Sequence, residues 1–304
     1  MATPLTTPFA KPGQFWRGNL HGHTTRSDGH RSPEEVCAFY RGAGYDFIAL
    51  TDHFLERYGW PLTEGPATPG LTTILGAELH PTRDRMELGE MWHIVAVGLP
   101  AGFAPTAPDE TGPQLAARAA EAGAFVFAAH PQWFAMTERD MLALDAAAGV
   151  EIFNAGCGED NDTAESAYML DQMLDRGRRL LACATDDSHF TPNARDHLAG
   201  WVMVKSERNE PEEIVAALKA GDFYASTGAG IYDLDLTPGE RLRLRCSPVS
   251  RAFAIGGPAV YRIAAAQGMT EAEFDLRDWR SPFVRVVVRD DTGRKAWTNP
   301  IWLD

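Results

Sequence analysis

The chain has 304 residues, of which 44% are hydrophobic and 23% are charged, values typical of a globular protein. Its formal net charge is −14, and without a compensating basic stripe this charge opposes binding to a nucleic-acid backbone. No apolar run approaches the roughly 18 residues of a membrane span, so we expect no membrane segment.

The length allows one barrel-sized domain and a small second domain. Residues 1–13 lack a basic region followed by an apolar stretch, which argues against a secretory signal and favours a cytoplasmic location. Neither a structural zinc site nor a disulfide framework is expected, because the cysteines lack Cys-x-x-Cys spacing. The four cysteines are Cys37, Cys157, Cys183 and Cys246.

Strand-like runs alternate with helical segments through the first two thirds of the chain. Seven or eight strands in this alternation predict a parallel sheet, and a closed barrel is the economical arrangement at this length. The expected strands are 15–20, 46–50, 72–77, 94–99, 125–129, 150–154, 180–184 and 201–205.

The clearest helix begins after Ser32, which is suited to cap the helix, with Pro33 in the first helical position and Glu35 completing a capping box. Further helices are expected over residues 113–122, 137–148, 163–176 and 211–220.

The pattern of apolar and polar residues changes after Gly228. Apolar and polar residues alternate over 232–237, 242–246, 260–265 and 283–289, and glycine-rich turns separate these runs. This pattern is typical of a half-exposed antiparallel sheet. We therefore predict a boundary between residues 1–228 and a small β-sandwich-like domain over residues 229–304. The second domain is expected to cover the barrel, to contact a partner subunit in a homo-oligomer, or both.

Six histidines and three carboxylates stand beside the strand-like runs of the first domain. On an extended strand, residues two apart face the same side, so His21 and His23 can bind the same ion. Imidazole and carboxylate together suit a divalent cation, and the carboxyl ends of barrel strands meet at one face. His93 is the exception, because it opens a run instead of closing one. The nine candidate ligands are His21, His23, Asp28, His53, Glu78, His93, His130, Asp187 and His189.

The order of these clusters resembles the PHP family, named for polymerase and histidinol phosphatase, over residues 15–228. Within that family, residues 18–24 and 293–301 are similar to the CehA/McbA-type metallohydrolase branch. The resemblance implies an α/β fold whose first domain is a distorted (β/α)7 barrel. The motifs that carry it are residues 21–29, Thr51-Asp52-His53, Gly76-Ala77-Glu78, His130-Pro131 and Asp187-x-His189.

The resemblance also implies two or three divalent ions, of zinc, manganese or iron. Ions about 3.5–4 Å apart lower the pKa of a bridging water and clamp an anionic oxygen. We assign Glu78, His130 and Asp187 to the catalytic centre as well. The implied ligand sets are His21, His23, Glu78 and Asp187 for a first ion, Glu78, His93 and His130 for a second, and Asp28, His53 and His189 for a third.

Two arginines are candidates for binding the substrate. Arg26 lies in the loop between His23 and Asp28, and Arg195 follows His189 by six residues. A guanidinium group presents a bidentate fork that matches phosphate, so we predict both as phosphate clamps.

Three further side chains leave alternatives open. His80 is two residues from Glu78, so it either faces the site as an auxiliary ligand or proton donor, or is a core residue. Trp133 and Phe134 either form a hydrophobic wall for the substrate or simply pack. Asp52 and Asp186, each beside a candidate ligand, are expected to make supporting hydrogen bonds instead of binding metal.

These features predict a metal-dependent phosphoesterase in which a metal-bridging hydroxide attacks a small phosphate monoester or related phosphoester. Three divalent ions against three carboxylates leave a positive site that attracts an anionic substrate, whereas two ions weaken that preference. The alternative is hydrolysis of a carboxylic or carbamate ester, as the CehA/McbA resemblance implies. The third hypothesis is a non-catalytic PHP module. We expect neither nucleic acid nor a membrane as a partner.

Overall fold

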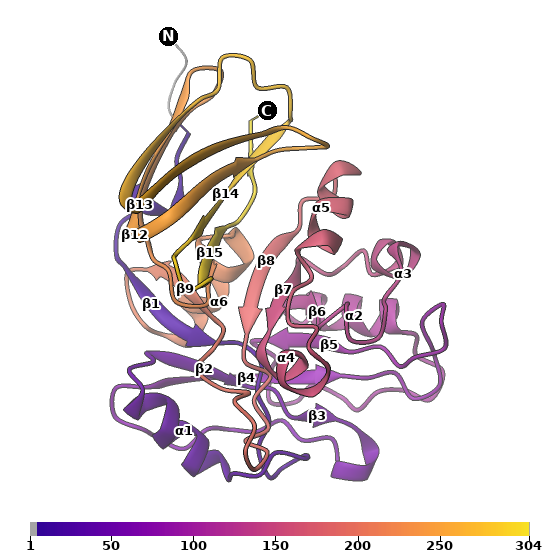
Figure 1. The fold of residues 1–304 in the computed structure, drawn as a ribbon. Coiled ribbons are helices and arrows are strands. Elements are labelled where there is room, and N and C mark those ends of the chain that lie inside the picture. Colours follow the sequence, from indigo (N-terminus) through magenta and orange to yellow (C-terminus); the bar gives the residue numbers. More distant parts are fainter. Residues whose placement is uncertain (1–4, 304) are drawn as a thin grey trace.

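The computed structural model describes residues 5–303. Within this range, 16 strands join into one mixed sheet against which the helices pack (Figure 1). Among the described residues, no helix is long and apolar enough to cross a membrane. The strands of the first two thirds are β1 (Gln14–Asn19), β2 (Phe47–Leu50), β3 (His53–Phe54), β4 (Thr72–Leu79), β5 (Ile94–Val97), β6 (Phe125–Ala128), β7 (Gly149–Asn154), β8 (Leu181–Thr185), β9 (Trp201–Ser206) and β10 (Phe223–Ser226).

All eight predicted strands of this part are present, with ends shifted by at most two residues. The predicted capping box is also confirmed, since the Ser32 side chain accepts from the Glu35 backbone N–H while the Glu35 carboxylate accepts from Ser32. The helices are α1 (Pro33–Gly42), α2 (Gly112–Glu121), α3 (Glu138–Ala143), α4 (Ala155–Asn161), α5 (Ala167–Asp175) and α6 (Pro211–Ala220), with single 3-10 turns at Pro8–Ala10 and Glu56–Tyr58.

Two helix predictions were too long, and α4 was not predicted. The helix expected over 137–148 ends at Ala143, and the one expected over 163–176 starts only at Ala167. The segment before α5 is held by the edge of β7 instead, because Glu165 pairs with Phe153 and the Ser166 N–H donates to the Ile152 carbonyl. Backbone groups already bonded in this way are unavailable to a helix.

The predicted closed (β/α)7 barrel is wrong, because the sheet stays open. β1 pairs with β2 in parallel on one side and with β9 in antiparallel fashion on the other. Both edges of β1 are thus used, and the path of paired strands ends at β8. Only a single bridge, Gly22 to Ser188, joins the segments that follow β1 and β8. The architecture is a mixed α/β fold with one large central sheet.

The sheet is also not purely parallel, because β5 runs antiparallel to both β4 and β6. Both faces of β5 are buried: Ile94 and Ala96 join the core on the side of α2, whereas Val95 and Val97 face the core shared with α6. Burial on both faces explains why this strand reads as a continuous apolar run.

The C-terminal third is rich in strands, as predicted, but its strands continue the same sheet. β15 pairs with β10, where Trp297 lies opposite Ala225. Strand β12 has register shifts on both sides of Val249, and such bulges bend a strand. The elements are β11 (Ile231–Thr237), β12 (Arg241–Ile255), β13 (Tyr261–Asp275), β14 (Phe283–Arg289), β15 (Lys295–Thr298) and β16 (Ile301–Trp302).

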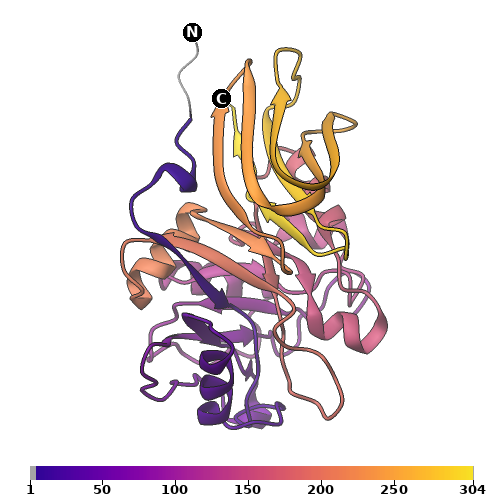
Figure 2. The same ribbon diagram turned by 60° about the vertical axis from the view of Figure 1, so that its left-hand side comes forward.

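Several contacts fasten the C-terminal strands to the rest. Figure 2 shows the N-terminal segment running alongside them, and the Leu5 N–H donates to the Leu236 carbonyl. The buried Asn299 side chain bonds to the backbone of residues 182, 221 and 223. The Arg285 guanidinium pairs with Asp171 on α5 at 2.8 Å. The division into two domains after residue 228 stays a prediction.

Candidate metal centre

The strand directions bring the predicted ligands to one edge of the sheet. His21 and His23 follow β1, His130 follows β6, and Asp187 and His189 follow β8. In the paired strands β3 and β4, His53 stands opposite Glu78.

The antiparallel course of β5 explains the position of His93. Because β5 runs against β4 and β6, its beginning lies beside their carboxyl ends. His93 precedes β5 and therefore reaches the same edge as residues that close the neighbouring strands.

Glu78 is the centre of the cluster, with 1% of its surface exposed. Its Oε1 atom lies 2.6 Å from His93 Nδ1 and 3.3 Å from His130 Nε2. Its Oε2 atom lies 2.7 Å from His53 Nδ1 and 3.6 Å from His21 Nε2. Burial opposes ionisation, but the surrounding histidines outweigh it and hold the pKa of Glu78 well below its usual value.

Asp187 joins the first two histidines to this centre. Its Oδ1 atom lies 2.9 Å from His23 Nε2 and 3.2 Å from His21 Nε2. Its Oδ2 atom accepts a hydrogen bond of 3.1 Å from Asn154. Asp187 has a backbone φ of 50°, and His130 one of 24°. Left-handed backbone at non-glycine residues is costly, and functional sites are where such strain collects.

Asp28 lies at the more open side of the cluster and contacts His53 and His189. Its Oδ2 atom lies 3.3 Å from His53 Nε2, and its Oδ1 atom lies 3.5 Å from His189 Nε2. Burial would raise the pKa of Asp28, but His53, His23 and His189 together lower it.

The donor atoms fit divalent ions. His21 Nε2 and Glu78 Oε2 are buried and have no hydrogen-bond partner within the described residues, although buried polar atoms are normally satisfied. A cation would supply what both atoms lack. Four groups of ligand atoms lie within 4.8 Å of one another: His23, Asp28, His53 and His189; His53, Glu78, His80 and His93; His21, Glu78 and His130; and His21, His23 and Asp187.

A buried carboxylate outside the predicted set supports the cluster. Glu151 is completely buried on β7, and its Oε1 atom lies 2.7 Å from His21 Nδ1. Its Oε2 atom accepts from the backbone N–H of His130. Sequence reasoning missed Glu151, although an acid inside the apolar run of a buried strand was an available signal.

The two aspartates beside ligands make supporting hydrogen bonds, as predicted. Asp52 accepts from the Thr24 N–H and the Ser27 hydroxyl, which lie in the loop that carries Asp28. Asp186 accepts from the backbone N–H groups of residues 198–200, in the loop that follows His189. Both carboxylates thus hold loops in place.

A cavity of about 240 Å³ opens onto the cluster. Trp133 and Phe134 form an apolar part of its wall, and the Phe134 ring centroid is 4.5 Å from that of His93. Arg26 and Arg195 are exposed and lie outside the lining, so their clamp role stays a prediction. The lining residues are His53, Glu78, His93, His130, Trp133, Phe134, Gly156, Cys157, Asp160, Asp187 and His189.

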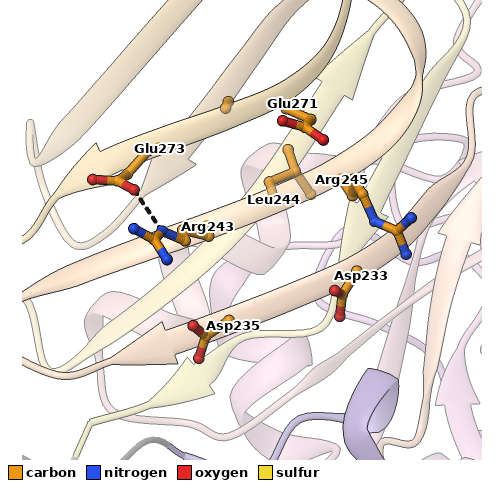
Figure 3. A pocket seen from close by; sticks show the side chains of 8 residues that line it. Asp233, Asp235, Arg243, Leu244, Arg245, Glu271 and Glu273 are labelled. Atoms are coloured by element: carbon orange, nitrogen blue, oxygen red, sulfur yellow. Dashed lines mark hydrogen bonds and ion pairs between the residues drawn. The ribbon is translucent and has the colours of Figure 1, made fainter.

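A larger open hollow of about 540 Å³ lies on the outer face of β11–β13. Figure 3 shows Arg243 and Arg245 on the middle strand between acidic residues of the two neighbouring strands. Arg243 and Glu273 form an ion pair at 2.6 Å and are both 56% exposed. Exposed cross-strand pairs of this kind stabilise a sheet modestly, and this hollow lacks the histidines of the buried cluster.

No family description and no curated protein matches the chain. Among solved structures, it is similar to a two-domain protein from Bacteroides vulgatus containing a predicted PHP-like metal-dependent phosphoesterase. The alignment covers 99% of both chains with a TM-score of 0.53 at 14% identity. The fold is PHP-like.

At this identity the likeness shows the PHP-like fold alone, and it does not single out the CehA/McbA branch. Weaker likenesses carry no argument. They are a proposed metal-dependent phosphoesterase from Bifidobacterium adolescentis (TM-score 0.41, 16% identity, 62% of this chain and 89% of that one) and an amidohydrolase from Chromobacterium violaceum with bound sulfate and no metal (TM-score 0.40, 18% identity, 57% and 87%).

Proposed function

We propose that the protein is a metal-dependent hydrolase whose first substrate class is small phosphoesters. The observation that carries the proposal is the convergence of all nine predicted ligand residues on one cluster beside a cavity, with Asp28 on its exposed side. The PHP-like fold of the Bacteroides vulgatus protein supports it. The presence of every ligand residue also argues against a non-catalytic module.

The position of Glu78 supports its predicted role as a bridge. Its two oxygens face different histidines, since Oε1 lies near His93 and His130 whereas Oε2 lies near His53 and His21. Such a carboxylate can serve two ions at once. The remaining first-ion ligands would be His21, His23 and Asp187, and the third ion would be held by Asp28, His53 and His189.

When bound, such ions would supply a water of lowered pKa and Lewis-acid activation of the substrate. The protein's own residues provide the rest. Asn154 donates to Asp187 and Glu151 accepts from His21, so these ligands are oriented from behind. Three divalent ions against Asp28, Glu78 and Asp187 would leave a net charge of about +3 in the site, which attracts a phosphate group.

The experiment is metal analysis of protein purified without chelator, followed by assay with p-nitrophenyl phosphate after loading with zinc, manganese or iron. We expect two or three ions for each chain and hydrolysis that chelation abolishes. Absence of phosphate release with every metal would exclude the phosphoesterase reading.

Hydrolysis of a neutral carboxylic or carbamate ester is the second candidate. It is favoured by the cavity lining, which contains Trp133, Phe134 and Cys157 but no lysine or arginine among the described residues. Asp160 at the same cavity would repel an anion. Turnover of 1-naphthyl carbamate by the same metal-loaded protein, without turnover of p-nitrophenyl phosphate, would select this reading.

A further inference from the structure

His80 lies beside the candidate centre but belongs to none of the three proposed ligand sets. Its side chain is completely buried. The Nδ1 atom lies 2.9 Å from the backbone carbonyl of Trp92, which can only accept a hydrogen bond. Nδ1 of His80 therefore carries a proton, and in the neutral ring Nε2 is an acceptor.

The donor to this nitrogen is His53, whose Nδ1 atom lies 2.8 Å from His80 Nε2. Glu78 Oε2 lies 2.7 Å from the same His53 nitrogen, yet this oxygen has no hydrogen-bond partner among residues 5–303. By hydrogen-bond geometry His53 Nδ1 therefore donates to His80, and its contact with Glu78 Oε2 is one of charge alone.

This hydrogen bond determines what the other nitrogen of His53 can do. In the neutral ring that an ion requires, the proton on Nδ1 leaves the lone pair on Nε2, and Nε2 lies 3.3 Å from Asp28 Oδ2, a second ligand of the same set. The same carboxylate lies 3.5 Å from His189 Nε2. The reverse arrangement, in which a cationic His80 donates to His53, would bury a positive charge beside the ligands of divalent ions.

We propose that His80 is a positioning residue that holds His53 in the tautomer able to bind an ion together with Asp28 and His189. The inference rests on the proposed metal centre and deepens it. Metal-binding histidines are commonly oriented by a hydrogen bond to their second ring nitrogen. For His53 this partner is the imidazole of His80, which is itself fixed by the Trp92 carbonyl. Binding of the third ion by Asp28, His53 and His189 then depends on His80, which is not a ligand itself. The positive charge that attracts the substrate depends on His80 in the same way.

Three substitutions test the proposal through zinc titration of metal-free protein against a chromophoric chelator. His80→Phe removes both hydrogen bonds, His80→Asn can keep the one to Trp92, and His80→Gln can still place an acceptor near His53. We expect the affinity for one ion to fall about 10- to 100-fold in the Phe and Asn variants and to stay near wild type in the Gln variant.

Matched controls identify the ion concerned. His30→Asn, at an exposed histidine, should leave every zinc affinity unchanged. Adding His80→Phe to the His189→Ala variant should cause no further loss of zinc affinity, because both substitutions affect the same ion. Unchanged affinities in His80→Phe would overturn the proposal. So would a loss in His80→Gln as large as in His80→Phe, because the imidazole of His80 would then be a ligand itself.

A direct measurement uses the unsubstituted protein in case the variants fail to fold. Long-range ¹H–¹⁵N spectra of zinc-loaded, ¹⁵N-histidine-labelled protein should show His53 protonated at Nδ1 and bound to zinc through Nε2. Zinc on Nδ1 of His53 would contradict the inference. Ion binding and nitrogen assignment are read without substrate, so an absence of hydrolysis would count against the proposed function alone.

Discussion

The Nδ1 atom of His21 lies 2.7 Å from Oε1 of Glu151, and both side chains are completely buried. The carboxylate accepts the imidazole proton, which leaves His21 Nε2 facing Glu78 and Asp187. This pairing orients a metal-binding histidine in the way that a hydrogen-bonded carboxylate usually does.

Glu151→Gln should therefore weaken metal binding about 10- to 100-fold. Oε1 accepts from His21 and Thr185, and Oε2 accepts from the His130 N–H and from Asn154, so an amide NH₂ meets donors in either orientation. A loss of about 1–3 kcal/mol in the free energy of unfolding should accompany this mismatch.

Metal titration and urea denaturation measure these two effects of Glu151→Gln. The exposed Glu212→Gln on α6 is the matched control and should change neither quantity. Equal metal affinity in Glu151→Gln and wild-type protein would show that His21 does not need this carboxylate.

Replacement of Asp187 or His130 by alanine should abolish hydrolysis while the protein stays folded. Asp187 contacts His21 and His23 and is 7% exposed, whereas His130 lies 3.3 Å from Glu78. Each substitution therefore removes a candidate ligand without opening the hydrophobic core. Steady-state assay and circular dichroism check the two halves of this expectation. Full activity in either variant would remove that residue from the proposed site.

Metal uptake should release protons near neutral pH. Burial alone would lower the pKa of His53, but Glu78 and Asp28 raise it to about 10. In the metal-free protein the imidazolium thus stabilises the fold fully below pH 6.5, the ordinary pKa of a histidine, and this stabilisation is lost as the pH rises through about 10. An ion that binds in this window must displace the proton, so its apparent affinity rises with pH.

Calorimetric titration of metal in buffers with different ionisation enthalpies measures this release. We expect clear release at pH 7 and less at about pH 9.5, close to the pKa of His53. His93 and His23 should contribute nothing, since burial lowers the pKa of His93 to about 3 and burial together with His189 and His53 lowers the pKa of His23 to about 4. Heats that are independent of the buffer at pH 7 would refute the expectation.

The ion pair between Arg285 on β14 and Asp171 on α5 should stabilise the attachment of the C-terminal strands. Arg285 is 4% exposed, so Asp171→Ala leaves a buried charge without its partner. We expect the free energy of unfolding to fall by about 1–3 kcal/mol, below the range for fully buried pairs because the Asp171 side chain is 38% exposed.

Asp275→Ala provides the control for this pair. It breaks the ion pair between Asp275 and Arg277, whose side chains are 52% and 77% exposed, and should have little effect. Urea denaturation of both variants measures the difference. A similar response in the two would mean that burial of Arg285 does not matter.

Local patterns predicted much of the secondary structure. Apolar runs located eight of the ten strands of the first two thirds. Strands β2, β5 and β6 are buried along their whole length, and burial on both faces leaves little room for polar residues. Capping residues located the start of α1. The same patterns overextended the helix expected over 163–176, because they do not show that Glu165 pairs with Phe153.

The sequence by itself determined which side chains are available as ligands, because histidines and carboxylates at strand ends are visible as residue types. The tertiary structure alone decided strand direction and pairing. The antiparallel course of β5 brings His93 to the cluster, and β9 takes the edge of β1 that closure of a barrel would need. Which atoms Glu151 and His80 contact behind the ligands was likewise decided by the tertiary structure, because hydrogen bonds between residues far apart in the chain exist only once the strands have paired.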